Sequence, residues 1–356
     1  MRNAKILQVI LLGAFWIAQG YAWSEVAPVS AFAGSDTVAA GSATAPVTLD
    51  VVVTGKSGQT VSGLQAQDFT LLDNKSPLKL ASFQATNGLS AKADPPVEAI
   101  ILVDSINSGI LTVAKERASL ADLFQANGGK LALPTSLVVL SYTGFILQDH
   151  PTQDGKALQE FLNKNTGGLR EHPGNGYEVD LERRRLSLRA LSAIAAEEKK
   201  KPGRKLLIWI SPGWASFAAS NVPMTDNERE GLFASIASLS TALREARMTL
   251  YSVDPMGAGV IQRYDQSLFK GVATDQRVSY GNLILPAIAT QSGGLQLYAS
   301  NDIAKMVEQC MADASSYYVL NFNPPAAGHA NEYHAIEVEV NKPGLKARTR
   351  VGYYAQ

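Results

Sequence analysis

The run from Val97 to Val103 constrains the fold of this chain more than any other feature, because it is apolar at every position except Glu98. Such a run is typical of a strand that is buried on both faces in the middle of a parallel sheet. It ends on Asp104, continues into a turn of mostly polar residues, and leads to a helical pattern over Leu111–Phe124. Because ligands of open α/β sheets bind beyond the carboxyl ends of the strands, Asp104 is the first candidate site residue.

Strands and helices alternate along the chain from this run to residue 314. The pattern predicts further strands at 137–142, 206–210, 248–253 and 293–298, and helices at 155–163, 179–201, 226–246, 282–290 and 302–314. The helix that starts at Asp226 has the spacing of a capping box, with Thr225 before it and Glu228 three residues after Thr225. Strands separated by helices imply right-handed crossover connections and a mostly parallel sheet.

Short strands with a period of two stand at both ends of the chain. We predict three of them before the α/β region, at 47–53, 67–72 and 78–84, and three after it, at 317–322, 332–340 and 345–353. Three strands make a marginal sheet, and two separate half-sheets would each leave edges and an apolar face uncovered. The two ends are therefore predicted to join into one discontinuous β-sandwich domain, residues 46–93 plus 315–356, into which an α/β domain of residues 97–314 is inserted.

The charge balance and the first residues of the chain indicate where the protein works. Lysine plus arginine and aspartate plus glutamate both number 32, which argues against a nucleic-acid partner because phosphate binding needs a basic surplus. Residues 1–22 have the pattern of a signal peptide, with basic residues, a short apolar core and small residues before a cleavage point after Ala22. An uncleaved membrane anchor is the alternative. We expect a secreted or periplasmic protein without a membrane span after signal removal, and a flexible lead-in over residues 23–45.

Sequence motifs for catalysis are missing. The four histidines lack metal-ligand spacing, and no nucleophile elbow, phosphate-binding loop or dinucleotide motif occurs. Cys310, the only cysteine, lies in an amphipathic helical pattern with no adjacent histidine, which favours a role in packing. We therefore predict that the protein is not an enzyme.

Motifs spread over most of the mature chain resemble a known family. They lie at Val61–Asp73, Ile100–Ser108, Arg204–Gly213, Tyr251–Pro255, Ile288–Gly294 and Lys342–Tyr354. The block from 97 to 314 resembles a von Willebrand factor type A (VWFA) domain, and the chain after the signal is similar to the VWFA-related Acidobacterial domain family. The resemblance implies an exported protein with a six-stranded, doubly wound, Rossmann-like sheet, and it implies no particular activity.

Type A domains usually carry a metal-ion-dependent adhesion site, with an Asp-x-Ser-x-Ser motif on one loop, a threonine on a second and an aspartate on a third. A hard divalent cation prefers such oxygen ligands. Here Asp104 and Ser108 match the first and last positions of the motif, and Ile106 replaces the middle serine. Pro212 stands where the aspartate of the third loop is expected. The resemblance therefore implies a degenerate metal site.

Two interpretations of this edge follow. In one, Asp104, Asn107, Ser108 and Asp254 gather oxygen atoms for a weakly held Mg²⁺ or Ca²⁺, since Asp254 also ends a predicted parallel strand. In the other, Asp104 and Asn107 cap the following helix and close the turn, and no cofactor is bound. The second is favoured, because one or two carboxylates without a surrounding cage hold divalent ions poorly.

Two tryptophans flank the turn of the third loop. Trp209 is predicted to be core. Trp214, which follows Pro212 and Gly213, is either an exposed partner contact, because tryptophan is enriched at binding hot spots, or packed under the loop of residues 167–180. The candidate partner-binding residues are Trp214, Ser211 and Asp104.

The sequence therefore predicts a secreted, non-enzymatic, adhesion-type module. It would bind a protein partner through the loops 104–109, 167–180, 211–214 and 254–259. The two alternatives are a metal-dependent envelope hydrolase that uses Asp104 and a structural envelope protein with no discrete site.

Overall fold

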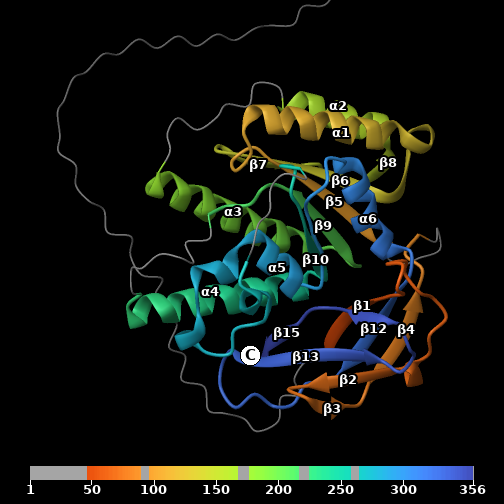
Figure 1. Ribbon diagram of the computed structural model, residues 1–356, viewed down its shortest axis with the longest axis vertical. Coiled ribbons are helices and arrows are strands. Elements are labelled where there is room, and N and C mark those ends of the chain that lie inside the picture. The colour runs from red at the N-terminus through yellow and green to blue at the C-terminus, as the bar shows by residue number, and fades with distance from the viewer. Residues whose placement is uncertain (1–45, 90–95, 167–175, 216–223, 258–263, 356) are drawn as a thin grey trace, which may run out of the picture. The chain divides into compact units, whose positions relative to one another are not determined.

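The computed structural model describes residues 46–89, 96–166, 176–215, 224–257 and 264–355. These residues belong to one compact unit, Thr44–Gln356. It is a mixed α/β structure with a mostly parallel seven-stranded sheet and two four-stranded antiparallel sheets (Figure 1). The predicted signal peptide and lead-in, residues 1–45, lie outside the described residues, and so do parts of the predicted partner-binding loops.

The large sheet is built from strands that run parallel in its centre and antiparallel at one side. The parallel strands are, in spatial order, β11 (Gln296–Leu297), β10 (Met248–Val253), β9 (Lys205–Ile210), β5 (Glu98–Asp104) and β6 (Lys130–Ser141). The antiparallel strands β7 (Gly144–Leu147) and β8 (Thr152–Asp154) both pair with β6. β5 is central and buried at all of its seven positions, as its apolar run predicts.

The number of six strands implied by the family resemblance is wrong, because the sheet continues beyond β6. This strand is 12 residues long and starts at Lys130, well before the predicted start at 137. Gly144, with φ of 122°, allows the chain to reverse into β7. β8 consists of three polar residues and has no alternation of apolar and polar positions that would predict a strand.

Helices cover both faces of the large sheet (Figure 1). One face carries α1 (Ile110–Gly129), α2 (Gly155–Thr166) and α6 (Ile303–Met311), and the other carries α3 (Tyr177–Glu198), α4 (Asp226–Glu245) and α5 (Leu285–Gln291). β5 serves both cores, with Ala99, Ile101 and Val103 in the first and Ile100 and Leu102 in the second. The doubly wound arrangement follows from this alternation, since both faces of a central strand must be covered.

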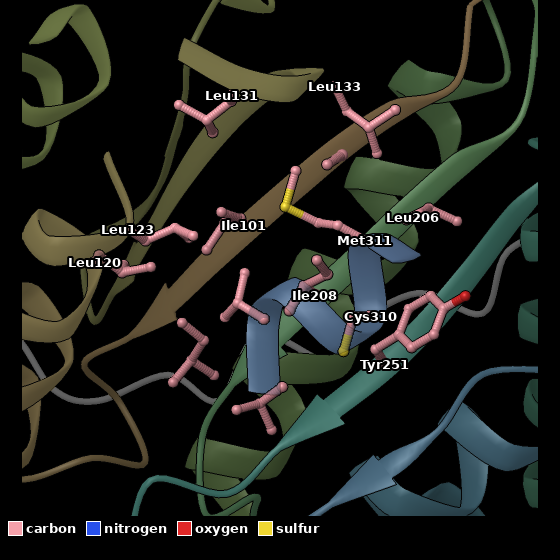
Figure 2. Packing of buried hydrophobic residues seen from close by; sticks show 14 of the residues in the cluster. Ile101, Leu120, Leu123, Leu131, Leu133, Leu206, Ile208, Tyr251, Cys310 and Met311 are labelled. Atoms are coloured by element: carbon pink, nitrogen blue, oxygen red, sulfur yellow. The ribbon is translucent and has the colours of Figure 1, made fainter. Parts of the chain in front are cut away.

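Buried side chains from several elements meet in the first core. Figure 2 shows Ile101, Ile208 and Tyr251 of three neighbouring strands together with Cys310 and Met311 of α6. The Cys310 thiol is buried, as its place in an amphipathic helix predicts, and this burial raises its pKa well above the usual range.

The ends of the helices follow local signals where these are present. Thr225 caps α4: its hydroxyl oxygen accepts from Glu228 N at 3.3 Å, while Thr225 N donates to Glu228 Oε2 at 2.7 Å. The predicted capping box is therefore confirmed. The connections between the described elements include five short 3-10 helices, Ala66–Asp68, Gln266–Phe269, Asp275–Arg277, Tyr280–Leu283 and Ala312–Ala314. Within the described segments, no helix combines the length and apolar character that crossing a bilayer requires.

The two antiparallel sheets combine strands from both ends of the chain. One has the order β14 (Lys346–Arg348), β1 (Val47–Thr54), β12 (Tyr317–Phe322), β4 (Ser82–Thr86), and the other β15 (Gly352–Ala355), β13 (Glu332–Val340), β2 (Phe69–Asp73), β3 (Ser76–Leu78). Val338 pairs with Leu71 across β13 and β2. The rings of Phe69 and Tyr318, from different sheets, lie 5.0 Å apart in one shared core. The predicted pairing between the two ends of the chain is confirmed.

Two predicted single strands are wrong in the same way. The segments 78–84 and 345–353 each contain parts of two strands, and these strands belong to different sheets. In the second segment Arg348 pairs with Val52 of β1, whereas Gly352 pairs with Ala335 of β13. The residues between them cross from one sheet to the other, and a pattern of period two does not reveal such a crossing.

Candidate functional site

The carboxyl ends of three neighbouring parallel strands bring the predicted site residues to one level. Ile210 of β9 pairs with Val103 of β5 on one side and with Val253 of β10 on the other. The residues that follow these three are Ser211, Asp104 and Asp254. Strands are spaced about 4.8 Å apart, so the backbones of Asp104 and Asp254, on either side of Ser211, are roughly 10 Å apart. We call this end of the sheet the carboxyl edge.

Asp104 is a buried carboxylate whose acceptor positions are occupied. Its Oδ1 accepts from the backbone N–H groups of Ile106 at 3.0 Å and Asn107 at 3.1 Å. Its Oδ2 accepts from Asn107 Nδ2 at 2.7 Å and from Trp209 Nε1 at 2.9 Å. An ionised carboxylate offers about four acceptor sites, so these four bonds use its capacity. Its side chain is completely buried.

Asn107 and Ser108 bind protein groups on either side of Asp104. Asn107 Nδ2 also donates to Ser187 Oγ of α3 at 2.9 Å, and Ser108 Oγ donates to Glu116 Oε1 of α1 at 3.1 Å. Ile106, which takes the place of the middle serine, is 2 % exposed and belongs to the second core. Asn107 and Ser108 therefore join the turn after β5 to α3 and α1, respectively.

Glu116 is a member of this group that the sequence interpretation missed. It is completely buried, and burial raises its pKa well above the usual range, with the nearby Asp104 charge raising it further. Its Oε2 is a buried atom without a hydrogen-bond partner among the described residues. The sequence contains a signal for this burial: Glu116 has helical spacing to Val113 and Leu120, which are buried.

Asp254 belongs to the turn that follows β10. It is 8 % exposed, and its Oδ1 accepts from Met256 N at 2.9 Å. Burial raises its pKa, while the hydrogen bond from Met256 and the charge of Lys115 act in the opposite direction. Lys115 of α1 donates to Pro255 O at 3.0 Å. This contact ties the turn to α1.

The three residues predicted to contact a partner are all buried. Ser211 is 1 % exposed and its Oγ accepts from Gly213 N at 2.9 Å. Trp214 is 6 % exposed, donates from Nε1 to Leu283 O at 2.8 Å, and lies edge-on to Trp209 with 5.6 Å between ring centroids. Of the two alternatives for Trp214, an exposed contact or a packed side chain, the exposed contact is wrong. Trp214 packs in the second core, because its indole finds both an aromatic neighbour and a carbonyl acceptor there. Trp209 is core, as predicted.

The oxygen atoms described at the carboxyl edge accept and donate hydrogen bonds within the protein, as in a turn, and are not grouped as the ligands of a metal centre. In the described parts of the chain, no group of three or more His, Cys, Asp or Glu side chains could hold a metal ion. The oxygen atoms of Asp104 and Ser108 are engaged in hydrogen bonds to protein groups. A divalent cation here would need to displace several of those bonds.

Large apolar side chains are exposed around this edge. The described residues have seven such side chains, Leu89, Ile110, Leu111, Ile146, Tyr177, Met256 and Tyr298. Five of them lie at the carboxyl edge: Ile110 and Leu111 start α1, Tyr177 starts α3, and Met256 and Tyr298 follow β10 and β11. Leu111 is 87 % exposed.

Contacts between loops hold part of this group together. Leu111 stands one turn before Lys115, which bonds to Pro255 beside Met256. A Cβ on Gly257 would lie 2.2 Å from Asn301 Oδ1, so the turn after β10 also contacts the loop that carries Tyr298. We call Leu111, Met256 and Tyr298 the edge apolar patch.

Comparison with known proteins gives no assignment. A scan with protein-family models and a search of curated proteins each found no match to this chain. The resemblance to type A domains therefore stays a prediction from sequence motifs.

Proposed function

We propose that this protein is an exported, non-enzymatic protein-interaction module of the VWFA type, with its α/β body inserted in a discontinuous β-sandwich, and that it binds a protein partner at the carboxyl edge. The observation that carries the proposal is the grouping of exposed apolar side chains there, at Leu111, Met256 and Tyr298. Exposed apolar patches on soluble proteins mark interaction sites. We propose Leu111, Met256 and Tyr298 as the contact residues in place of Trp214, Ser211 and Asp104, which are buried.

The proposed partner is a protein with an apolar contact surface, bound without a metal bridge. Lys115 is exposed and Asp254 is buried beside it, and the two carry opposite formal charges next to the patch, so the surface favours no strongly charged ligand. The four hydrogen bonds accepted by Asp104 support metal independence, since its carboxylate is already coordinated by donors of the protein.

The experiment compares capture of envelope proteins by the wild type and by a Leu111→Ser, Met256→Ser double variant, with and without EDTA. Leu89→Ser is the matched control, because Leu89 is 44 % exposed and lies away from the carboxyl edge. We expect one partner to be retained by the wild type and the control, lost by the double variant, and unaffected by EDTA.

Other outcomes identify the alternatives. Capture that EDTA abolishes and Mg²⁺ restores, together with its loss in Asp104→Ala, would favour a metal-dependent function such as an envelope hydrolase. Equal capture by the wild type and the double variant would contradict the proposed surface. Capture of nothing by any form would favour a structural envelope protein.

A further inference from the structure

A small polar cavity lies where the α/β part meets the antiparallel sheets. Its volume is about 20 Å³. One wall is formed by Arg244 and Arg247, at the end of α4 and just before β10, and the other by Asp50 of β1 and by Arg350, which follows β14. We call it the arginine cavity.

Positive charge exceeds negative charge in the arginine cavity. Three arginines and one aspartate line it, so two positive charges are in excess. Asp50 is already paired, since its carboxylate accepts from Arg247 Nη2 and, at 3.4 Å, from Arg247 Nε. The carbonyl end of α4 offsets about half of one charge. More than one positive charge therefore lacks an anionic partner.

Arg350 is the clearest case of a positive charge in the cavity without an anionic partner in the described part of the chain. It is 7 % exposed. Burial together with the nearby Arg244 lowers its pKa to about 10, while the charge of Asp50 acts in the opposite direction, so Arg350 stays charged at neutral pH. A guanidinium has five N–H donors. Within the described residues, its one hydrogen bond is from Nη1 to Ser240 O, at the long distance of 3.5 Å.

Arg244 repeats the pattern beside it. Burial lowers its pKa, and its Nε is a buried atom with no acceptor in the described parts of the chain. Buried charges in proteins are normally paired. Arg350 is buried and Arg244 is half-buried, and the two guanidinium groups repel each other. The one carboxylate among the described residues that line the cavity, Asp50, is paired with Arg247, so the arginine pair suits an anion from outside the chain.

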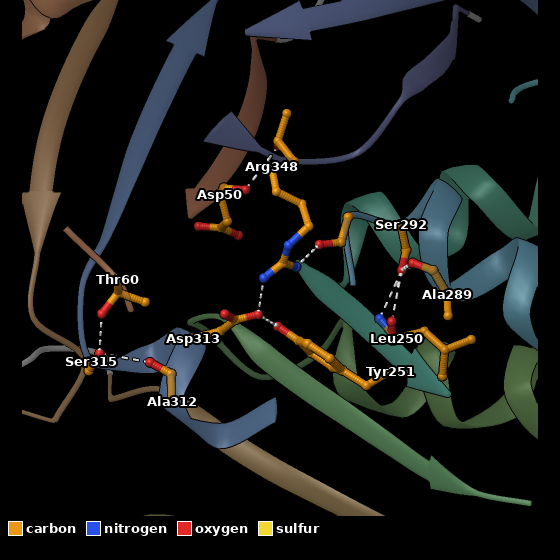
Figure 3. Close-up of polar contacts among 12 residues, drawn as sticks. Asp50, Thr60, Leu250, Tyr251, Ala289, Ser292, Ala312, Asp313, Ser315 and Arg348 are labelled. Atoms are coloured by element: carbon orange, nitrogen blue, oxygen red, sulfur yellow. Dashed lines mark hydrogen bonds and ion pairs between the residues drawn. The ribbon is translucent and has the colours of Figure 1, made fainter. Parts of the chain in front are cut away.

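The neighbouring Arg348 shows what the chain does where it supplies the anion itself. Arg348 donates to Asp313 Oδ2 and to Gly293 O, and Asp313 also accepts from Tyr251 OH at 2.6 Å (Figure 3). Two residues later along the same segment, Arg350 has no corresponding acid among the described residues. Arg348 therefore has a complete ion pair, whereas Arg350 has none among the described residues.

We propose that the arginine cavity binds one small monatomic inorganic anion of the size of chloride, held between Arg244 and Arg350. A single water needs roughly 10–15 Å³ of such space, so a volume of 20 Å³ accommodates one ion of that size, whereas a tetrahedral oxyanion requires the walls to move apart. The bound anion ties the end of α4 to the segment between β14 and β15, which crosses between the two antiparallel sheets. It stabilises the junction between the α/β part and the sandwich.

The first test measures the thermal midpoint of the purified full chain in sodium chloride, sodium bromide and sodium gluconate at equal ionic strength. We expect a saturable rise of several degrees with chloride and bromide relative to gluconate, because a ligand that binds the folded state stabilises it by mass action. Arg350→Met should lose this difference. Arg189→Met, at an exposed arginine of α3, should keep it. Equal midpoints in gluconate and chloride for the wild type would overturn the proposal.

The second test does not depend on a variant that folds. Crystals of the wild type grown with bromide should give an anomalous peak between Arg244 and Arg350. Absence of that peak would overturn the proposal even if halides raise the midpoint, and occupation by sulfate in preference to bromide would contradict the assigned size.

Discussion

The carboxyl edge around Asp104 and the arginine cavity around Arg350 are both buried polar centres, and they differ in how their hydrogen bonds are completed. At the edge, one carboxylate accepts four bonds from the protein. In the cavity, Arg350 makes one long bond to a carbonyl oxygen. The edge attracts attention in the sequence because a strand ends there on an acid, yet its acid is satisfied. Our anion proposal therefore rests on unmet hydrogen-bonding capacity at Arg350 and not on the position of a residue in a motif.

The largest effect is expected from breaking the completed ion pair beside the cavity. Arg348→Met leaves the buried carboxylate of Asp313 without its cation, and we expect a loss of about 3–5 kcal/mol in the free energy of unfolding. Arg350→Met in gluconate should change it by less than about 1 kcal/mol, since an apolar residue of similar length replaces a buried charge without a carboxylate partner. Urea unfolding measures both. Equal losses would show that Arg350 is paired as well as Arg348.

The next effect concerns the carboxyl edge. Asp104→Ala leaves the buried Trp209 Nε1 and the N–H of Ile106 without their acceptor, so we expect a loss of roughly 2–4 kcal/mol. Asp302→Ala is the control, because Asp302 is an exposed helix cap that accepts from Lys305 N and should cost about 1 kcal/mol. A smaller loss at Asp104 than at Asp302, or a stability that rises with Mg²⁺ in the wild type only, would reverse the structural interpretation of Asp104.

The pH dependence of stability tests Glu116. Its pKa is raised in the folded protein, so above its unfolded value of about 4.3 the unfolded chain releases a proton that the folded chain keeps. Stability from this group is fully present below that pH and falls as pH rises towards the folded pKa, by at most about 1.4 kcal/mol per pH unit. Glu116→Gln should remove this fall.

The measurement is the free energy of unfolding at pH 4.5 and pH 7.5. We expect the Glu116→Gln variant to gain on the wild type by about 1 kcal/mol or more at the higher pH. The same substitution at Glu160, whose carboxylate is largely exposed, is the control. If the difference between wild type and Glu116→Gln is the same at both pH values, Glu116 ionises normally in the folded state.

The smallest loss of stability is expected when one hydrogen bond at the carboxyl edge is removed but its donor keeps another acceptor. Ser187→Ala removes the hydroxyl that accepts from Asn107 Nδ2, but that nitrogen keeps its bond to Asp104. We expect a loss of about 0.5–1.5 kcal/mol in urea unfolding, with the thermal response to chloride unchanged. A response to chloride that disappears in this variant would mean that the two centres are coupled.

The predictions that came directly from local sequence are those the structure confirms most closely. The apolar run of β5, the capping box at Thr225 and the burial of Trp209 and Cys310 each depend on residues close together in the chain. The boundaries of β10, β12 and β13 also agree with the predicted ranges. Weaker local signals failed: the strand predicted at 293–298 is reduced to Gln296–Leu297, and the helix predicted at 282–290 begins as a 3-10 turn.

At the candidate site, too, the sequence predicted what depends on local pattern and missed what depends on packing between elements. The sequence placed Asp104, Ser211 and Asp254 at one edge, because parallel strands end together, and the strand pairing agrees. It did not reveal that Trp214 packs on Trp209, or that Glu116 joins Asp104, because each depends on how an element separated in the chain packs against another.

By itself, the sequence determined the central strands, most of the long helices and which strand must be covered on two faces, because spacing of apolar residues encodes burial within an element. Only the tertiary structure decided that Arg348 meets Asp313 while Arg350 meets Arg244. These two arginines are neighbours on one short segment, and their partners come from different helices. Charge pairing is decided by distances between elements, which no local pattern contains.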